Sequence, residues 1–223
     1  MLATVASAGL LFAAAGFAQS TVVTFDNGGE GWDGNGSIEE TGGNPGANAH
    51  FLIENFGIEY RTDSNAAFIG DLTPAPSATV GIDALVNSIT FEGNEVSRNL
   101  IVEFRSRALA VDGYPWTSVW FNLGVLQAGT EWGKFSVTFT PDSAVLPAGW
   151  GGYGAEDPNT FEPILPEGIT FADVMASVDE VAFTTYEPGW FFGFTIFDVR
   201  IDNLRIDRAE GNDTVFVDGF DGP

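Results

Sequence analysis

The apolar pattern near the C-terminus constrains the fold of this chain more than any other feature. Apolar residues alternate with polar ones and then resume one residue out of step, at Phe197, Val199 and Ile201 and then at Leu204 and Ile206. Strict alternation is typical of a half-buried β-strand, and a one-residue slip sends the following side chains to the opposite face. Residues 194–207 therefore predict a closing strand with a β-bulge at Asp202-Asn203.

Other stretches of alternating or β-branched residues, separated by turn-forming residues, indicate about ten strands in all. Residues 99–107 place Leu100, Val102 and Phe104 on one face and Glu103, Arg105 and Arg107 on the other. We expect residues 118–125 and 132–139 to pair with each other. Residues 141–166 are rich in Gly and Pro and are expected to form one long surface loop.

One helix is expected. Thr170 and Asp173 have the spacing of a capping box, and the apolar residues that follow fall at helical spacing, namely Phe171, Val174, Met175 and Val178. Many strands with a single helix predict an all-β fold, a two-sheet antiparallel β-sandwich of the jelly-roll type with one short helix.

The chain divides into three predicted parts. Residues 1–18 are apolar, uncharged and end in small residues, which is typical of a signal peptide. Residues 19–208 form the sandwich, and residues 209–223 form a short acidic and aromatic tail. No later apolar run is long enough to cross a membrane, so we expect a secreted or cell-surface protein with no span in the mature chain.

Composition excludes several kinds of site. The 223 residues include 31 Asp and Glu against 8 Lys and Arg, a net charge of −23, which repels nucleic acid. Cysteine is absent, which excludes disulfides and thiolate metal sites. The single histidine, His50, excludes any site with two imidazoles, and its place on a predicted strand favours a structural role.

Several short sequence motifs follow one another along the chain in an order that resembles a known group of domains. They are Phe25-Asp26 at the end of the opening strand, Trp32, the loop GGNPG at 42–46, FIGDLT at 68–73, TFADVMASV at 170–178 and IDNLRI at 201–206. Together, over residues 21–206, they resemble the laminin-B-like and carbohydrate-binding-module-like jelly rolls, domains of the galactose-binding-like type found in secreted bacterial proteins. FIGD is similar to the laminin-B signature except that Ile69 replaces a leucine.

The resemblance implies a structural calcium ion. In many such modules an acidic residue after the first strand and an aspartate of the last strand share an ion with a glycine-loop carbonyl. The matching residues are Asp26 and Asp202, with Gly43 or Asn44 as the loop contributor. Calcium binds such oxygen ligands in flexible geometry. The alternative is that Asp202 and Asn203 only make local hydrogen bonds at the bulge.

Aromatic residues provide a second candidate site. Aromatic rings stack on sugar rings, and exposed aromatic clusters usually indicate an interaction surface. The candidate ligand-binding residues are Trp150, Tyr153, Trp116 and Trp190, with Trp150 and Tyr153 in the long loop the most suggestive. Trp120 lies within a predicted strand and is expected in the core.

Catalysis is the least favoured class. A glycosidase needs two carboxylates close together, and the candidate pairs, Glu54 with Glu59 and Asp198 with Asp202, arise readily by chance among 31 acidic residues. The sequence therefore predicts an exported, non-catalytic module that binds a polysaccharide or matrix glycan. The alternatives are a structural or adhesive surface protein without a sugar site, and a glycan-active hydrolase. The oligomeric state is not indicated.

Overall fold

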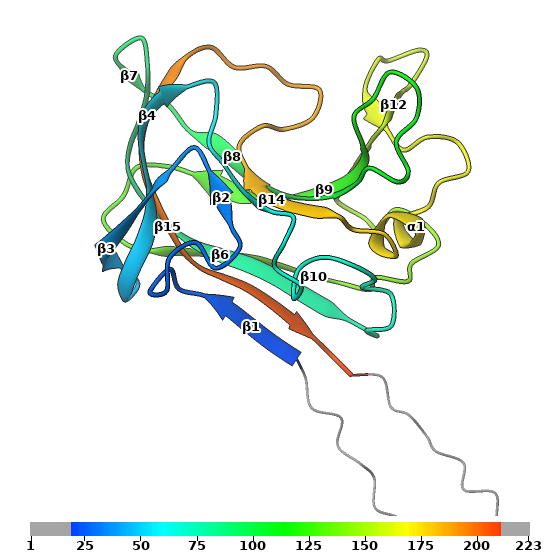
Figure 1. The fold of residues 1–223 in the computed structure, drawn as a ribbon. Helices are drawn as coiled ribbons and strands as arrows, with labels where there is room; N and C mark the ends of the chain where they lie inside the picture. The colour runs from blue at the N-terminus through cyan, green and yellow to red at the C-terminus, as the bar shows by residue number, and fades with distance from the viewer. Residues whose placement is uncertain (1–18, 211–223) are drawn as a thin grey trace, which may run out of the picture.

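The computed structural model describes residues 19–210 and confirms the antiparallel β-sandwich with one short helix (Figure 1). The predicted signal peptide, residues 1–18, and the predicted tail from residue 211 onward lie outside the described residues. In the part of the chain that is described, no helix is long and apolar enough to cross a membrane.

Two sheets form the sandwich. The first has the order β10 (Gly133–Phe139), β6 (Ala78–Phe91), β15 (Thr195–Arg208), β4 (Gly46–Asn55) and β3 (Ser37–Gly43), with β1 (Gln19–Val23) paired to β15 and β7 (Asn94–Glu95) paired to β6. The second has the order β11 (Trp150–Tyr153), β9 (Thr117–Leu126), β8 (Arg98–Ser106), β14 (Glu180–Thr184), β5 (Glu59–Thr62) and β2 (Asp33–Gly34). A separate two-stranded ribbon pairs β12 (Ala155–Glu156) with β13 (Pro163–Ile164).

The predicted bulge in β15 is confirmed. The register between β15 and β6 shifts between Asp202 and Arg205, and Asn203 has a positive φ of 51°. The bulge is also where β15 changes partner along its other edge. Residues 195–201 pair with β4, and residues 204–208 pair with β1. One strand therefore joins both ends of the described chain to the centre of the first sheet.

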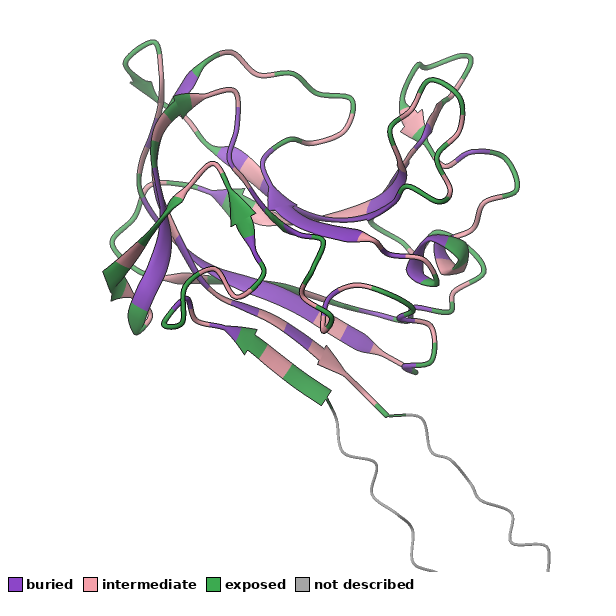
Figure 2. Ribbon diagram, in the orientation of Figure 1, coloured by how far each residue is buried: buried purple, intermediate pink, exposed green. Residues whose placement is uncertain are grey.

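The core lies between the sheets, where the inward side chains of the long strands are buried (Figure 2). The predicted helix is confirmed as α1 (Phe171–Met175), with Thr170 as its N-cap and Asp173 completing the capping box. Its buried residues Phe171, Val174 and Met175 close one end of the core.

Two expectations about chain path are wrong. β9 and β10 do not pair with each other, because β10 crosses to the first sheet and pairs with β6. This crossing turns Phe135, Val137 and Phe139 toward the core from the opposite side. Residues 141–166 are not one surface loop, because they contain β11, which extends the second sheet beside β9.

Candidate functional site

A cleft of about 380 Å³ lies on the outer face of the second sheet. In Figure 1 the connection between β14 and β15 rises on one side of this curved sheet, and the β8–β9 connection rises with β12 on the other. Charged and aromatic side chains line the cleft. They are Glu59, Glu103, Arg105, Trp116, Tyr153, Tyr186, Glu187 and Trp190, together with Pro188 and Gly189.

The floor of the cleft is an ion cluster centred on Arg105. Its guanidinium donates from Nε to Glu103 Oε2 at 2.8 Å, from Nη1 to Glu180 Oε1 at 2.6 Å and from Nη2 to Glu59 Oε2 at 2.8 Å. The three carboxylates come from β8, β14 and β5, so one buried cation ties three neighbouring strands together. The alternation of β8 produces this arrangement, since Val102 and Phe104 face the core while Glu103 and Arg105 face outward, as predicted.

Pairing within the cluster outweighs burial in its effect on the pKa of Arg105 and of Glu180. Burial alone would lower the pKa of Arg105, but the adjacent Glu103 and Glu59 carboxylates outweigh it and raise that pKa. Burial would raise the pKa of Glu180, but hydrogen bonds from Arg105 and Arg107 outweigh it and lower that pKa. A general acid needs a raised pKa, whereas the pKa of Glu180 is lowered, so Glu180 is not suited to that role.

Aromatic rings form the walls. Trp116 Nε1 donates to Glu103 Oε1 at 3.2 Å, and the Arg105 guanidinium lies 4.5 Å from the centre of the Trp116 ring. Tyr153 stands beside Trp116, with a distance of 6.2 Å between ring centres. Burial, and then the Glu103 carboxylate, raise the pKa of Tyr153, so its hydroxyl stays protonated. On the facing wall Trp190 is 69% exposed.

The structure brings three of the four predicted aromatic residues to this cleft: Trp116, Tyr153 and Trp190. Trp150, the fourth candidate, is not among the lining residues of the cleft. Trp150 is 8% exposed and packs in the core, with its ring centre 4.9 Å from that of Phe171 and 5.1 Å from that of Phe139. Trp150 and Tyr153 both lie on β11, and strand alternation places Trp150 on the core face and Tyr153 on the cleft face.

Trp120 is also not where the sequence predicted. It pairs in register with Glu103 on one side and Gly151 on the other, which places it on the cleft face of the second sheet instead of in the core. Its indole covers Gly151 so closely that a Cβ at residue 151 would lie 2.2 Å from the ring. A glycine is therefore required beneath this tryptophan.

The four predicted calcium residues also lie together, at the junction where β15 changes partner. Asp202 Oδ2 accepts a hydrogen bond from the Asn44 amide, and Asp26 Oδ1 accepts one from the Ala47 amide at 3.0 Å. A Cβ at Gly43 would lie 2.8 Å from Asp202 Oδ2. We call Asp26, Gly43, Asn44 and Asp202 the clasp.

Within residues 19–210, neither carboxylate of the clasp has a cationic partner. Asp202 is fully buried, and burial, together with the nearby Asp83 and Asp26 carboxylates, raises its pKa to about 6. Of these three, only Asp83 has an arginine partner, Arg205 at 2.9 Å, among the ion pairs of residues 19–210. The sequence did not indicate Asp83, which is a single carboxylate inside an apolar strand.

The oxygen donors of the clasp fit calcium in kind. Two carboxylates and the loop carbonyls are the ligands that this ion prefers, and a buried carboxylate without a cation is stabilised by one. Local bonding is present as well, because Asp202 Oδ1 accepts from the Asn203 amide at 2.6 Å. Within residues 19–210 no three acidic or histidine side chains form a metal cluster, so carbonyl oxygens would have to complete the ligand set.

The predicted carboxylate pairs do not converge on the cleft. Glu54 lies on β4 in the first sheet and Glu59 on β5 in the second. Asp198 lies on β15 in the first sheet, as Asp202 does, and accepts a hydrogen bond at 2.8 Å from His50. His50 is buried between Asp198 and Glu39, with 2.8 Å to each, and sits in a hydrogen-bonded network of the first sheet.

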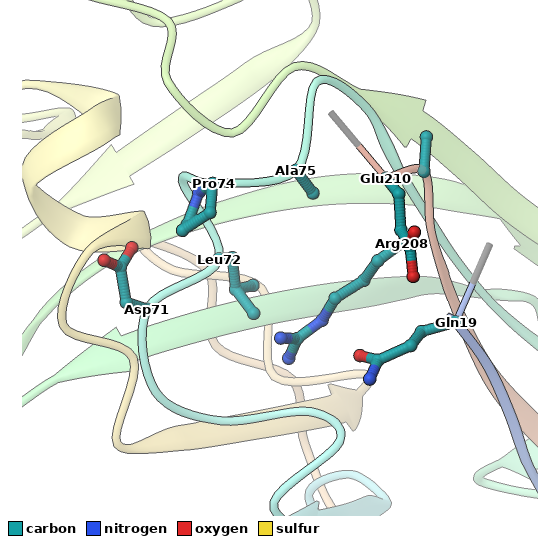
Figure 3. Close-up of a pocket in the computed structure, with 8 residues that line it drawn as sticks. Gln19, Asp71, Leu72, Pro74, Ala75, Arg208 and Glu210 are labelled. Carbon is teal, nitrogen blue, oxygen red and sulfur yellow. The ribbon is translucent and has the colours of Figure 1, made fainter. Parts of the chain in front are cut away.

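A second cavity, of about 440 Å³, lies where the described chain begins and ends (Figure 3). Arg208 and Gln19 point into it from β15 and β1. No aromatic ring is among its described lining residues, and the Arg208 guanidinium donates to the Ala67 carbonyl. The cavity therefore lacks the stacking surface that the cleft provides.

No protein-family model matches the chain, and neither does any curated protein sequence. The laminin-B-like resemblance therefore stays a prediction.

Among solved structures, the chain is similar to the N-terminal CBM22-1 and GH10 modules of endo-1,4-β-D-xylanase 10B from Clostridium thermocellum in complex with xylohexaose, with 11% identity, a TM-score of 0.46 and 84% of this chain covered. An exo-β-agarase is similar with 13% identity, a TM-score of 0.48 and 88% covered. A further agarase is similar with 11% identity, a TM-score of 0.44 and 82% covered.

The chain spans about a quarter of the length of each of these solved chains, namely 28%, 26% and 23%. Likeness at this level does not assign a function. A function for this chain has to come from the geometry of its own cleft.

Proposed function

We propose that this protein is an exported, non-catalytic module that binds a glycan chain in the cleft of the second sheet. The observation that carries the proposal is one cleft with the exposed Trp190 ring on one wall, the half-buried Tyr153 and Trp116 rings on the other, and carboxylates on its floor. Trp190 and Tyr153 supply ring faces for the apolar sides of sugar rings, and Glu59 supplies an acceptor for hydroxyl groups.

The test is a glycan array of plant, algal and microbial polysaccharides. We expect Trp190→Ala to lower the affinity for any bound glycan by about tenfold or more, equivalent to about 1.4 kcal/mol, without lowering the melting temperature. Phe161→Ala is the matched control, because Phe161 is 74% exposed and lies outside the cleft. No binding on the array, or binding that Trp190→Ala leaves intact, would contradict the proposal.

We propose also that the clasp holds a structural calcium ion. Asp26 and Asp202 would supply carboxylate oxygens, and Gly43 or Asn44 a carbonyl oxygen. The ion would neutralise the buried Asp202 charge and join the segment after β1 to the turn between β3 and β4 and to β15. Removal of calcium with EDTA should lower the melting temperature, and Asp202→Ala should abolish that sensitivity. A melting curve that EDTA does not move would exclude the ion.

One observation favours the alternative of an adhesive protein. Phe191 and Phe194 are 79% and 57% exposed and pack on Phe56, with ring-centre distances of 5.1 Å and 4.0 Å. An exposed aromatic patch of this kind is typical of a protein-contact surface. Under this alternative, Phe191→Ser with Phe194→Ser would abolish cell-surface or matrix attachment, and Trp190→Ala would not.

A further inference from the structure

We infer that the cleft selects uncharged glycans over acidic ones, and that Glu59 is the residue that sets this selection. The inference rests on the proposed function and names the ligand class of the same cleft. It follows from the hydrogen bonds within the cleft, which occupy its cationic groups and leave one carboxylate oxygen free to accept from a ligand.

The cationic groups at the floor are all paired. Arg105 donates to Glu103, Glu180 and Glu59 through its Nε and both terminal nitrogens. Around it, Arg61 lies 3.2 Å from Glu180, and Arg107 lies 2.7 Å from Glu180 and 2.9 Å from Asp179. Arg105 is the one guanidinium among the described lining residues of the cleft, and each of its nitrogens is already bonded to a carboxylate. A carboxylate or sulfate on a ligand would have to break one of these charge-assisted hydrogen bonds to reach it, and such bonds are about twice as strong as neutral ones.

The lining of the cleft is also negative. Its charged side chains are Glu59, Glu103 and Glu187 against Arg105 alone, and the whole chain has a net charge of −23. A glycan with a uronate or sulfate on each repeat would place like charges beside these carboxylates in a partly desolvated site. The negative charges of ligand and cleft would repel each other, and the repulsion is stronger in a partly buried site because the effective dielectric constant is lower there.

Among the three carboxylates bound to Arg105, Glu59 is the one that reaches a ligand. Its side chain is 23% exposed, whereas those of Glu103 and Glu180 are 3% and 1% exposed. Glu59 Oε2 is held by Arg105 at 2.8 Å, while Oε1 has only Arg61 Nε at 3.8 Å, which is beyond hydrogen-bond distance. Oε1 is therefore free to accept from a sugar hydroxyl. A neutral, hydroxyl-rich chain offers that donor, and an acidic group in the same place offers only acceptors.

The experiment measures affinity for pairs of polysaccharides that share a backbone and differ only in charge. Suitable pairs are a polyuronate with its carboxyl-reduced form and a sulfated galactan with its desulfated form. In 0.01 M salt we expect the wild-type protein to bind the uncharged member at least tenfold more tightly. Raising the salt to 1 M shortens the screening length from about 30 Å to about 3 Å and should reduce this preference.

Glu59→Gln should reduce the low-salt preference at least fivefold, because it removes one negative charge and keeps an acceptor oxygen. Glu95→Gln is the matched control, since it removes the same charge from the exposed strand β7 of the other sheet. The salt series on the wild-type protein tests the inference even where Glu59→Gln lowers the melting temperature. Equal or tighter Trp190-dependent binding of acidic members would overturn the inference and leave the glycan function standing. Absence of Trp190-dependent binding to every polysaccharide would instead overturn the proposed function.

Discussion

At the scale of the residue, Arg105 does most to shape the cleft. Its side chain is 4% exposed, and its guanidinium bridges carboxylates on three strands and lies over the Trp116 ring. A buried charge is costly unless it is paired and hydrogen-bonded, and here each nitrogen has a carboxylate partner. The orientation of Trp116 therefore depends on Arg105 and on Glu103, which accepts the indole N–H.

Arg105→Met should lower the free energy of unfolding by about 3–5 kcal/mol, because it leaves buried Glu103 without its cation and removes one of the three arginines paired with buried Glu180. Arg61→Met is the matched control. Arg61 also contacts Glu180, but its side chain is 45% exposed, so we expect a loss of about 1 kcal/mol or less. Urea unfolding measures both values. Equal losses for the two variants would show that burial of the Arg105 cluster does not matter.

At the scale of the element, β15 organises the first sheet. It runs beside β6 for its whole length and passes from β4 to β1 at the bulge. The bulge could be predicted because a slip in alternation is a local property of residues 197–206. The pairing of β9 and β10 was predicted wrongly because sheet membership depends on the distant partner β6, which no local pattern reveals.

The bulge makes stability depend on pH. The pKa of Asp202 is about 6 in the folded state against an ordinary value of 3.8, so the folded state holds this proton more tightly. In calcium-free buffer, this residue's contribution should therefore fall as the pH rises from about 4 to about 6, by up to about 3 kcal/mol. The measurement is the unfolding free energy of wild type minus that of Asp202→Ala across this range.

Added calcium should reverse that trend, because the ion binds the ionised carboxylate and stabilises the folded state more at higher pH. A difference between wild type and Asp202→Ala that does not change with pH in calcium-free buffer would show that Asp202 titrates normally. A fall that calcium leaves unchanged would confirm the raised pKa and exclude the ion.

At the scale of the whole molecule, the two faces of the second sheet have separate tasks. Its inner face fills the core and its outer face lines the cleft, and β11 contributes to both through Trp150 and Tyr153. Chemistry alone identifies aromatic residues as candidates for sugar contact. It does not tell which face of a strand each one occupies when glycines surround it, as they do at 149, 151 and 152.

For the same reason, the charged face of residues 99–107 was predictable from alternation, but its partners were not. Glu59 and Glu180 come from strands 46 and 75 residues away from Arg105 along the chain. Only the assembled sheet brings them to the cleft floor.

Trp150→Ala should lower the free energy of unfolding by about 3–5 kcal/mol, because it opens a cavity among Phe104, Phe139 and Phe171. Trp190→Ala removes the same side chain from an exposed position and should cost less than about 0.5 kcal/mol. Comparable losses in thermal or urea unfolding would mean that the two tryptophans are not divided between core and surface as described.

A crystal structure with the tightest-binding oligosaccharide from the glycan array tests the central claim most directly. We predict sugar rings in the cleft between Trp190 and the Tyr153–Trp116 wall, with a hydroxyl group within hydrogen-bond distance of Glu59 Oε1. Density for the sugar on the first sheet, or against Phe191 and Phe194 with the cleft empty, would contradict the assignment of this cleft as the glycan site.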